Sequence, residues 1–368
     1  MYRLQILQVQ KCQEEFERAL SLGQYDKARL IALRCSELLR QLASENLNFS
    51  HILLEEARKW ELKAKTITER KKKEFRNEYF EMLKALIRKS RITWNDIGGL
   101  REAKRLIAQA IGLNIARSPI DPPRGILLFG PPGTGKSLLA SAVANNLNAT
   151  FFSVKASDLL SKYFGESSKL VSALFSLARQ MNPSVIFIDE IDSLTLKRSA
   201  LDDAARRMIG TLLAEIDGFK DKKEKVILLA ATNTPWDLDE AILSRLPIRI
   251  YTPLPDVEAA IEIFKIHLRG ISYRVNLYKL AKEAVKRLYS GREIENTVKL
   301  ATMKMLEEMN PELGDPLRVT TLKEKDLTTR PLTIDDFKYA MARIKSPITK
   351  NEIKKYEKWA KEFGTLSS

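Results

Sequence analysis

Metal-binding residue types and long apolar runs are scarce in this sequence of 368 residues. It contains two cysteines and two histidines, so we expect no zinc site. No apolar run reaches the roughly 18 residues that a membrane span requires. The first residues become charged early and no small-residue cleavage site follows, which argues against a secretory signal peptide. These absences predict a cytoplasmic protein that meets membranes only indirectly.

Negative charge is also in deficit, because 62 Lys and Arg stand against 47 Asp and Glu, a net charge of +15. A nucleic-acid or acidic-lipid partner would explain this excess, and so would a solvated surface. Residues 67–91 hold nine basic and four acidic residues. Elsewhere the excess is spread thinly, without a stripe of basic and aromatic residues. The distribution favours the solvated surface, and we do not expect nucleic acid as the partner.

The chain is long enough for two or three domains. Residues 1–70 carry three apolar stripes at helical spacing, which predict a three-helix bundle. A basic linker is expected over 71–91. The stripes are Val9, Cys12, Phe16 and Leu20; Ala28, Ile31, Cys35, Leu39 and Leu42; and Leu53, Ala57, Trp60, Ala64 and Ile67.

From residue 92 the pattern changes to short β-rich runs that alternate with helical stretches. The runs are GILLF, TFFSV, VIFIDE, VILLAAT and RIYTPL. This alternation predicts a parallel sheet covered by helices, an α/β domain over 92–255. Helical periodicity then returns, which predicts a helical lid over 256–345 and a terminal helix within 346–368.

A glycine-rich segment with the pattern GxxxxGK[ST] follows the first of these strands. Its glycines let backbone N–H groups converge on phosphate oxygens, and the helix that follows adds its N-terminal dipole. The lysine would reach the β- and γ-phosphates of ATP, and the serine would bind Mg²⁺. The expected nucleotide-binding positions are Pro132, Gly133, Thr134, Gly135, Lys136, Ser137 and Leu138.

An acidic pair ends the buried run VIFI. A carboxylate at the carboxyl end of a parallel strand faces the ligand site of such sheets. Asp189 is expected to hold Mg²⁺ together with Ser137, and Glu190 to act as the general base that polarises the attacking water. The pair therefore indicates ATP hydrolysis rather than binding alone.

These motifs and their order resemble those of the AAA ATPases over residues 92–345. Within that family the chain resembles the meiotic clade, which includes the ESCRT-III disassembly ATPase, katanin and spastin. The resemblance implies that Asp96, Ile97 and Gly98 contact adenine. It also implies that Asn233 orients the lytic water and that Gly291 approaches the nucleotide.

Two further segments resemble parts of the family's machinery that act outside the nucleotide pocket of one subunit. Lys162, Tyr163 and Phe164 resemble the first pore loop, whose aromatic side chain grips polypeptide of any sequence; the alternative is a buried aromatic pair. The second pore loop is expected near 197–207. Arg245 resembles an arginine finger that acts in the neighbouring subunit, or it forms an ion pair within its own chain.

The clade usually has two adjacent arginines at the finger position, and here Ser244 replaces the first of them. Arg249 is the distant candidate for the missing role. The terminal residues resemble those of the ESCRT-III disassembly ATPase, with residues 310–331 in place of a small β-domain. The shortness of that segment and the Lys/Glu richness resemble thermophilic archaeal relatives.

The N-terminal helices resemble a microtubule-interacting and trafficking (MIT) domain, although a tetratricopeptide-like hairpin or a coiled-coil adaptor would show similar stripes. The resemblance implies a hexamer that uses ATP to disassemble ESCRT-III-like filaments, for example in cell division, by binding their tails and pulling them through a pore. The alternatives are another AAA unfoldase, a katanin-like severing ATPase, a nucleic-acid motor and a nucleotide-gated scaffold.

The two cysteines lie outside these motifs. If the first two helices form a hairpin around residues 23–24, Cys12 and Cys35 lie at the same height on facing stripes. They are then either two small buried side chains or a disulfide.

Overall fold

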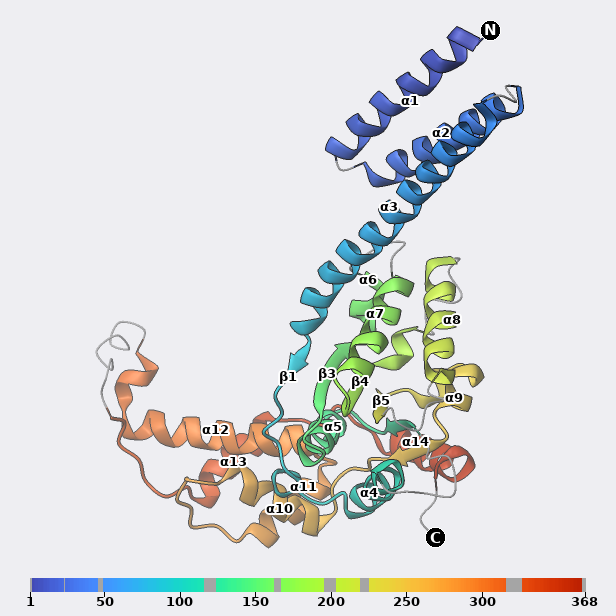
Figure 1. The fold of residues 1–368 in the computed structure, drawn as a ribbon. Coiled ribbons are helices and arrows are strands. Elements are labelled where there is room, and N and C mark those ends of the chain that lie inside the picture. Colours follow the sequence, from blue (N-terminus) through green and yellow to red (C-terminus); the bar gives the residue numbers. More distant parts are fainter. Residues whose placement is uncertain are drawn as a thin grey trace. The chain divides into compact units, whose positions relative to one another are not determined.

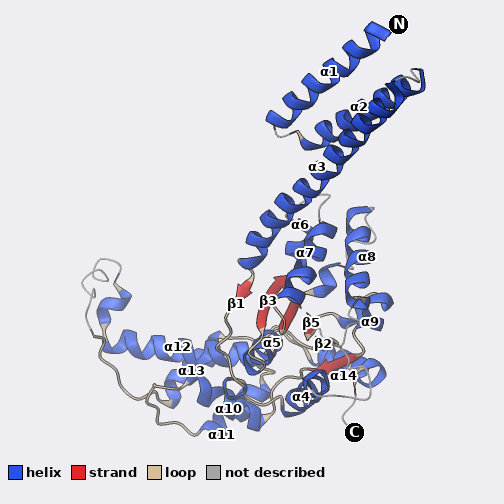
Figure 2. Ribbon diagram, viewed as in Figure 1, coloured by secondary structure: helices blue, strands red, loops and turns tan. Residues whose placement is uncertain are grey.

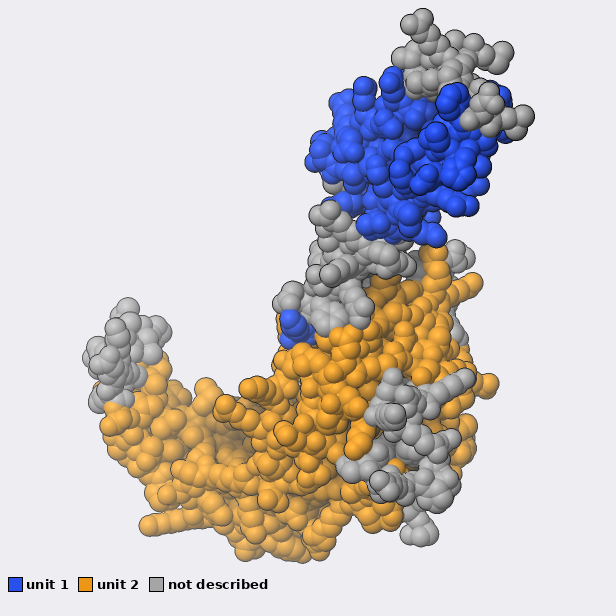
Figure 3. Space-filling view, in the orientation of Figure 1, with its two compact units in different colours: residues 1–84 blue, residues 85–368 orange. Residues whose placement is uncertain are grey.

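The computed structural model describes residues 2–22, 24–45, 49–115, 124–161, 167–194, 203–218, 225–315 and 326–365. They belong to two compact units, residues 1–84 and 85–368, which Figure 3 colours separately. Within the described ranges, no helix combines the length and apolarity needed to cross a bilayer.

The described part of unit 1 consists of helices α1 (Tyr2–Ser21), α2 (Tyr25–Glu45) and α3 (Ser50–Lys84), drawn in blue in Figure 1. The three predicted apolar stripes share one buried core, with Leu20 and Leu53 at its margin. At its centre the rings of Phe16 and Trp60 meet edge to face, with centroids 4.9 Å apart. The stripes therefore face inward as predicted, because each repeats at the period of a helix.

Unit 1 differs from the sequence prediction at its end. Helix α3 continues through residues 71–84, the first part of the segment expected to be a linker. Glu, Lys, Arg, Met and Leu, all strong helix formers, supply most of this stretch, and it contains neither Gly nor Pro. Since nothing in this stretch breaks a helix, the boundary between the units falls after Lys84 rather than after residue 70.

Cys12 and Cys35 are both buried and free. Burial, with a smaller contribution from the neighbouring Cys12, raises the pKa of the Cys35 thiol. Both side chains belong to the same core of unit 1, as expected for residues on inward-facing stripes. The structure holds both residues as thiols, as expected for two small buried side chains.

Unit 2 is built on a six-stranded sheet with the order β1-β3-β4-β5-β2-β6. All neighbouring strands are parallel except β1, which pairs antiparallel with β3 at one edge. Figure 2 shows the strands in red among the helices. The strands are β1 (Ile87–Arg88), β2 (Gly125–Phe129), β3 (Thr150–Lys155), β4 (Ser184–Asp189), β5 (Val226–Thr232) and β6 (Ile248–Tyr251).

Strands β2 and β5 are buried along their whole length, as expected for a sheet covered on both faces. Helices α4 (Arg101–Ile115) and α5 (Lys136–Asn146) supply the apolar side chains of one core against the sheet. Helix α7 (Ser167–Gln180) packs on β4 and on α8 (Asp203–Asp217). The remaining helices of this part are α6 (Ala156–Ser161) and α9 (Glu240–Arg245).

After β6 the chain is helical, as predicted. Helices α10 (Val257–His267), α11 (Leu277–Lys286), α12 (Gly291–Met309) and α13 (Ile334–Arg343) surround a second core that includes Phe264, Tyr289 and Phe337. Helix α14 (Lys350–Phe363) begins with a reciprocal cap between Thr349 and Glu352. Its buried residues are Tyr356 and Trp359.

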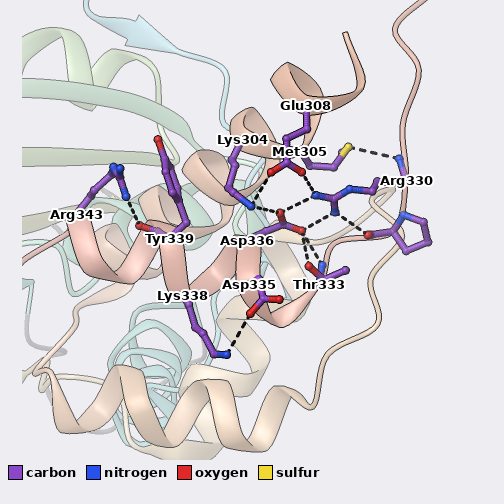
Figure 4. Close-up of polar contacts among 11 residues, drawn as sticks. Lys304, Met305, Glu308, Arg330, Thr333, Asp335, Asp336, Lys338, Tyr339 and Arg343 are labelled. Carbon is purple, nitrogen blue, oxygen red and sulfur yellow. Dashed lines mark hydrogen bonds and ion pairs between the residues drawn. The ribbon is translucent and has the colours of Figure 1, made fainter. Parts of the chain in front are cut away.

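A buried carboxylate, that of Asp336, holds the lid helices together (Figure 4). The Arg330 guanidinium donates to both of its oxygens at 2.7 and 2.8 Å, and the Lys304 ammonium lies 3.1 Å away. The backbone N–H of Thr333 donates a further bond at 2.8 Å. These donors, with Arg330 first, hold the pKa of Asp336 well below its usual range. The cluster fixes residues 330–336 against α12.

Replacing Asp336 with Asn should lower the free energy of unfolding by about 2–4 kcal/mol at pH 7, because two cations lose a fully buried partner. The folded-state pKa of Asp336 is depressed, so its contribution is complete above the unfolded pKa of about 3.9 and declines at lower pH. Urea denaturation at pH 7 and pH 3 should therefore show a smaller difference at pH 3.

The adjacent Asp335 supplies the control, because its pair with Lys338 is exposed on both sides (74% and 70%). Asp335→Asn should change the unfolding free energy by less than about 0.5 kcal/mol. Equal effects of the two substitutions would contradict the central role of Asp336.

Candidate nucleotide site

One cavity of about 630 Å³ lies at the carboxyl ends of β2, β4 and β5, between the sheet and the lid. This is where open parallel sheets bind their ligands. The cavity brings together nearly all nucleotide-site residues expected from the sequence. They are Asp96, Ile97, Gly98, Pro132, Gly133, Thr134, Gly135, Lys136, Ser137, Leu138, Asp189, Glu190, Asn233 and Gly291.

The loop between β2 and α5 has a shape that requires glycine. Gly130, Gly133 and Gly135 have φ values of 148°, 77° and 94°, which residues with a side chain rarely adopt. A Cβ on Gly133 would lie 2.2 Å from the Ser290 hydroxyl, at the start of α12. The missing side chain lets the lid approach the loop backbone, while α5 presents its N-terminus to the cavity.

Lys136 is a buried cation inside this loop. Only 7% of the residue is exposed, and its ammonium donates to the carbonyls of Gly130 and Pro131 at 2.9 and 2.8 Å. Burial lowers the pKa of Lys136 to about 8, and the charge of Asp189 partly offsets this effect. A phosphate at the N-terminus of α5 would stabilise the charged form.

Ser137, in the first turn of α5, and Asp189, at the end of β4, bring two oxygen ligands together. The Ser137 hydroxyl donates to the Asp189 carboxylate at 3.1 Å. Mg²⁺ prefers carboxylate and hydroxyl oxygens with phosphate nearby, so this pair fits the ion. The neighbouring Glu190 has a φ of 54° and donates its backbone N–H to Asp189 at 3.0 Å. This left-handed backbone, rare for a residue with a side chain, occurs where Glu190 lines the cavity.

Residues 232–234, at the end of β5, form the loop that carries Asn233 into the cavity. The Thr232 hydroxyl donates to Asp192 at 2.6 Å and accepts the Thr234 backbone N–H at 3.0 Å. The backbone carbonyl of Asn233 accepts a hydrogen bond from the Tyr356 hydroxyl of α14. The loop is therefore fixed on both sides of Asn233.

Residues 93–101, which lead into α4, contact lid helix α10 through Gly99 and Arg101. Asp96 caps its own turn by accepting from Thr93, and it pairs with Arg269 at 2.8 Å. The bonds from Thr93, with the contribution of Arg269, lower the pKa of Asp96 to about 2. The backbone N–H of Gly99 donates to Glu262 at 2.7 Å. The side chain of Asp96 thus serves the local turn, while the segment lines the cavity.

Arg245 lies on α9 and is not among the residues that line this cavity. Its guanidinium makes two bonds to Asp217, at 3.1 and 2.9 Å, and one to the Ser244 hydroxyl at 2.7 Å. Within one chain it forms the ion pair that the sequence left open as the alternative. Arg249 donates to carbonyls that include those of Leu243 and Leu246. Like Arg245, Arg249 is thus engaged within its own chain.

The comparisons with known proteins agree with this geometry. The family described as "ATPase family associated with various cellular activities (AAA)" matches residues 126–254, and the "Vps4 C terminal oligomerisation domain" matches residues 316–364. The crystal structure of the FIGL-1 AAA domain in complex with ADP has a TM-score of 0.67 at 32% identity, and the match covers 79% of this chain and 98% of that one. The chain belongs to the AAA ATPase family.

Curated relatives of this AAA ATPase are longer proteins. A cell division cycle protein 48 homolog of Archaeoglobus fulgidus is 41% identical, over 77% of this chain and 39% of its own length. A katanin p60 ATPase-containing protein of Danio rerio is 40% identical, over 76% and 59%. The chain thus spans about half the length of the curated relatives it matches. The family match over residues 126–254 and these relatives show that the chain is an ATPase.

The AAA site also contains charged residues that the sequence reasoning did not single out. Arg292 and Glu295, on the first turns of α12, and Glu262, on α10, line the cavity. The charge of Arg292 contributes to the lowered pKa of Lys136. Arg292 carries a local signal in the sequence, because it directly follows Gly291. Glu262 carries no such signal, since only the fold brings it to Gly99.

The pore-loop predictions are not resolved by the structure. Lys162, Tyr163 and Phe164 lie outside the described residues. Of the expected second pore loop at 197–207, the structure describes only the part from Asp203, where α8 begins.

Replacing Gly133 with Ala should weaken MgATP binding by about tenfold or more, because the new Cβ would meet Ser290 and would require a left-handed backbone. Titration with a fluorescent ATP analogue measures the affinity. Gly112→Ala in α4 is the matched control, since a Cβ there meets nothing within 4 Å. The close-approach argument fails if Gly133→Ala binds as tightly as Gly112→Ala.

Proposed function

We propose that this AAA ATPase works as a homo-oligomer, a hexamer, that disassembles ESCRT-III-like filaments by pulling their subunits through a central pore. The observation that carries the proposal is that one of the expected catalytic residues lies outside the cavity that holds the others. Lys136, Glu190 and Asn233 share one cavity, whereas Arg245 lies outside it on α9. An arginine that serves hydrolysis from this position must act on the cavity of a neighbouring subunit.

Within the cavity the residues divide the work of hydrolysis. Lys136 and the loop backbone bind the phosphates, and Ser137 with Asp189 would hold Mg²⁺, which neutralises charge on the phosphate oxygens. The carboxylate of Glu190 accepts the proton of the attacking water. Asn233 orients that water. The buried surroundings of Lys136 strengthen its attraction for phosphate, because a low-dielectric site screens charge weakly.

Arg245 is suited to act between subunits. Its pair with Asp217 is partly exposed, at 34% and 53% of the two side chains. Exposed ion pairs of this kind contribute at most about 1 kcal/mol. A γ-phosphate of the adjacent subunit can therefore replace Asp217 at little cost. The match of residues 316–364 to an oligomerisation domain supports such an assembly.

We assign capture of the filament to unit 1. Its three described helices share one core, which fits an MIT-like domain that binds the tails of ESCRT-III-like subunits. Lys162, Tyr163 and Phe164 would then grip the tail inside the pore. This assignment needs no nucleic-acid partner.

The second candidate is katanin-like severing of a filament such as a microtubule. The curated relatives named katanin, at 40% identity, favour it. The match to the oligomerisation domain named after Vps4 favours the first candidate. Both candidates use the same nucleotide site and differ in the polymer that is bound.

Replacing Arg245 with Ala should lower kcat by about 10³-fold or more, as for other arginines that act in trans on a phosphoryl group. Lys136→Ala should also be inactive, because the phosphates lose their buried cation. Mixing the two inactive variants should restore part of the ATPase activity, since some interfaces pair an intact cavity with an intact Arg245. Co-assembled mixtures without any recovered activity would show that Arg245 acts only within its own chain.

Sedimentation distinguishes the two polymers. The full chain with MgATP should release subunits of preformed ESCRT-III-like filaments into the supernatant and leave microtubules intact. Glu190→Gln is the control, because it keeps nucleotide binding and loses the general base. Shortened microtubules with intact ESCRT-III-like filaments would support the katanin-like candidate instead.

A further inference from the structure

Helix α14 makes a direct contact with the loop that carries Asn233. The hydroxyl of Tyr356 donates to the backbone carbonyl of Asn233 at 2.5 Å. The Tyr356 ring is buried, with 6% of the residue exposed. It lies nearly parallel to Tyr251, with centroids 6.4 Å apart and planes at 20°, and its centroid is 5.0 Å from that of Trp236. This packing holds the Tyr356 ring in one orientation, which fixes the direction of its hydroxyl.

The rest of this segment is anchored to strands that border the same cavity. Trp359 meets Phe129, the last residue of β2, with ring centroids 4.5 Å apart. The backbone N–H of Thr365 donates to the Arg249 carbonyl at 2.8 Å, and the Arg249 N–H donates to the Thr365 hydroxyl. These contacts hold α14 across the ends of β2 and β6, so Tyr356 approaches Asn233 from a rigid support.

The bond from Tyr356 differs from the others described for residues 232–234. The bonds of Thr232 to Asp192 and to Thr234 come from the sheet domain itself. The bond to the Asn233 carbonyl comes from residues more than a hundred positions later in the chain. A loop held at Thr232 and Thr234 alone keeps freedom to rotate the peptide of Asn233 between them. The Tyr356 hydroxyl removes that freedom.

The Tyr356 hydroxyl remains a donor under all ordinary assay conditions. Burial, with the nearby carboxylates of Glu352 and Asp192, raises the pKa of Tyr356 to about 12. A phenol that stays protonated keeps its hydrogen bond to the carbonyl.

We propose that Tyr356 is a positioning residue for ATP hydrolysis, which holds the Asn233 backbone so that the Asn233 amide faces the attacking water. The inference rests on the proposed role of Asn233 and goes beyond it by naming the group that fixes this residue. Tyr356 is not among the residues that line the cavity, so it acts through Asn233. Helix α14 thereby becomes part of the hydrolytic machinery rather than a cover for the sheet.

The decisive variant is Tyr356→Phe, which removes the hydroxyl and keeps the stacked ring. It should lower kcat by about tenfold, because a half-buried carbonyl loses its donor and the loop gains alternative conformations. The KM for ATP, the affinity for a fluorescent ATP analogue and the sedimentation of the assembly should stay within about twofold of the parent, since the ring contacts of α14 remain.

Lys355 supplies the matched control. Its ammonium lies 3.5 Å from the ring centroid of Trp236, so it contacts the same face of the sheet domain from the same helix. The side-chain contact described for Lys355 is with Trp236, not with Asn233. Lys355→Met should leave kcat within about twofold. If Lys355→Met lowers kcat as much as Tyr356→Phe does, the effect is general docking of α14 and the inference is overturned.

A double-mutant cycle separates this inference from the proposed function. The bond uses the backbone of Asn233, so it survives in Asn233→Ala, which removes only the amide. If Asn233→Ala lowers kcat and adding Tyr356→Phe lowers it no further, the two residues act as one unit. An equal loss in both backgrounds overturns the inference, as does a full kcat for Tyr356→Phe alone. An unchanged kcat for Asn233→Ala instead refutes the proposed role of Asn233, and the inference with it.

Discussion

The close approach of two backbones, that of the phosphate loop and that of the first turn of α12, is the constraint on which the site depends. Gly133 has no side chain, and Ser290 occupies the space that a Cβ would take. Gly291 lies in turn beside the carbonyl of Gly133. Because the two surfaces meet there, the sheet domain and the lid enclose one cavity instead of presenting two open faces. A nucleotide bound in this cavity would contact both the sheet domain and the lid.

The cavity concentrates one buried positive charge among groups that hold it in place. Lys136 is surrounded by loop carbonyls, and its pKa is lowered by burial. The acidic residues at the end of β4 face the same space. A polyanion accompanied by a divalent cation satisfies both sets of charges at once, whereas a neutral ligand satisfies neither. The electrostatics of the pocket therefore select the ligand class, and the backbone shape selects how it is held.

The lid and α14 contribute more than enclosure. Asp336 and its cations fix the segment that leads into α13, and α14 then returns to the sheet domain beside β2 and β6. Through Tyr356 this return reaches the loop of Asn233. Residues 316–364 match an oligomerisation domain, so the segment that contacts the Asn233 loop belongs to the part of the chain associated with assembly. This contact joins that part of the chain to the loop that carries Asn233 into the cavity.

The sequence by itself determined the features that depend on local pattern. The strands at 125–129 and 226–232, the glycine-rich loop before Lys136 and the stripes of the N-terminal helices follow from the period and identity of nearby residues. The boundary after residue 70 was wrong, because an even run of helix formers carries no stop signal. The two-residue strand β1 is too short to show a period. Only the tertiary structure decided the contacts between distant segments, such as Glu262 with Gly99, Arg245 with Asp217 and Tyr356 with Asn233. Each pairs a side chain with a group whose position depends on how the domains pack, and no spacing along the chain encodes that packing.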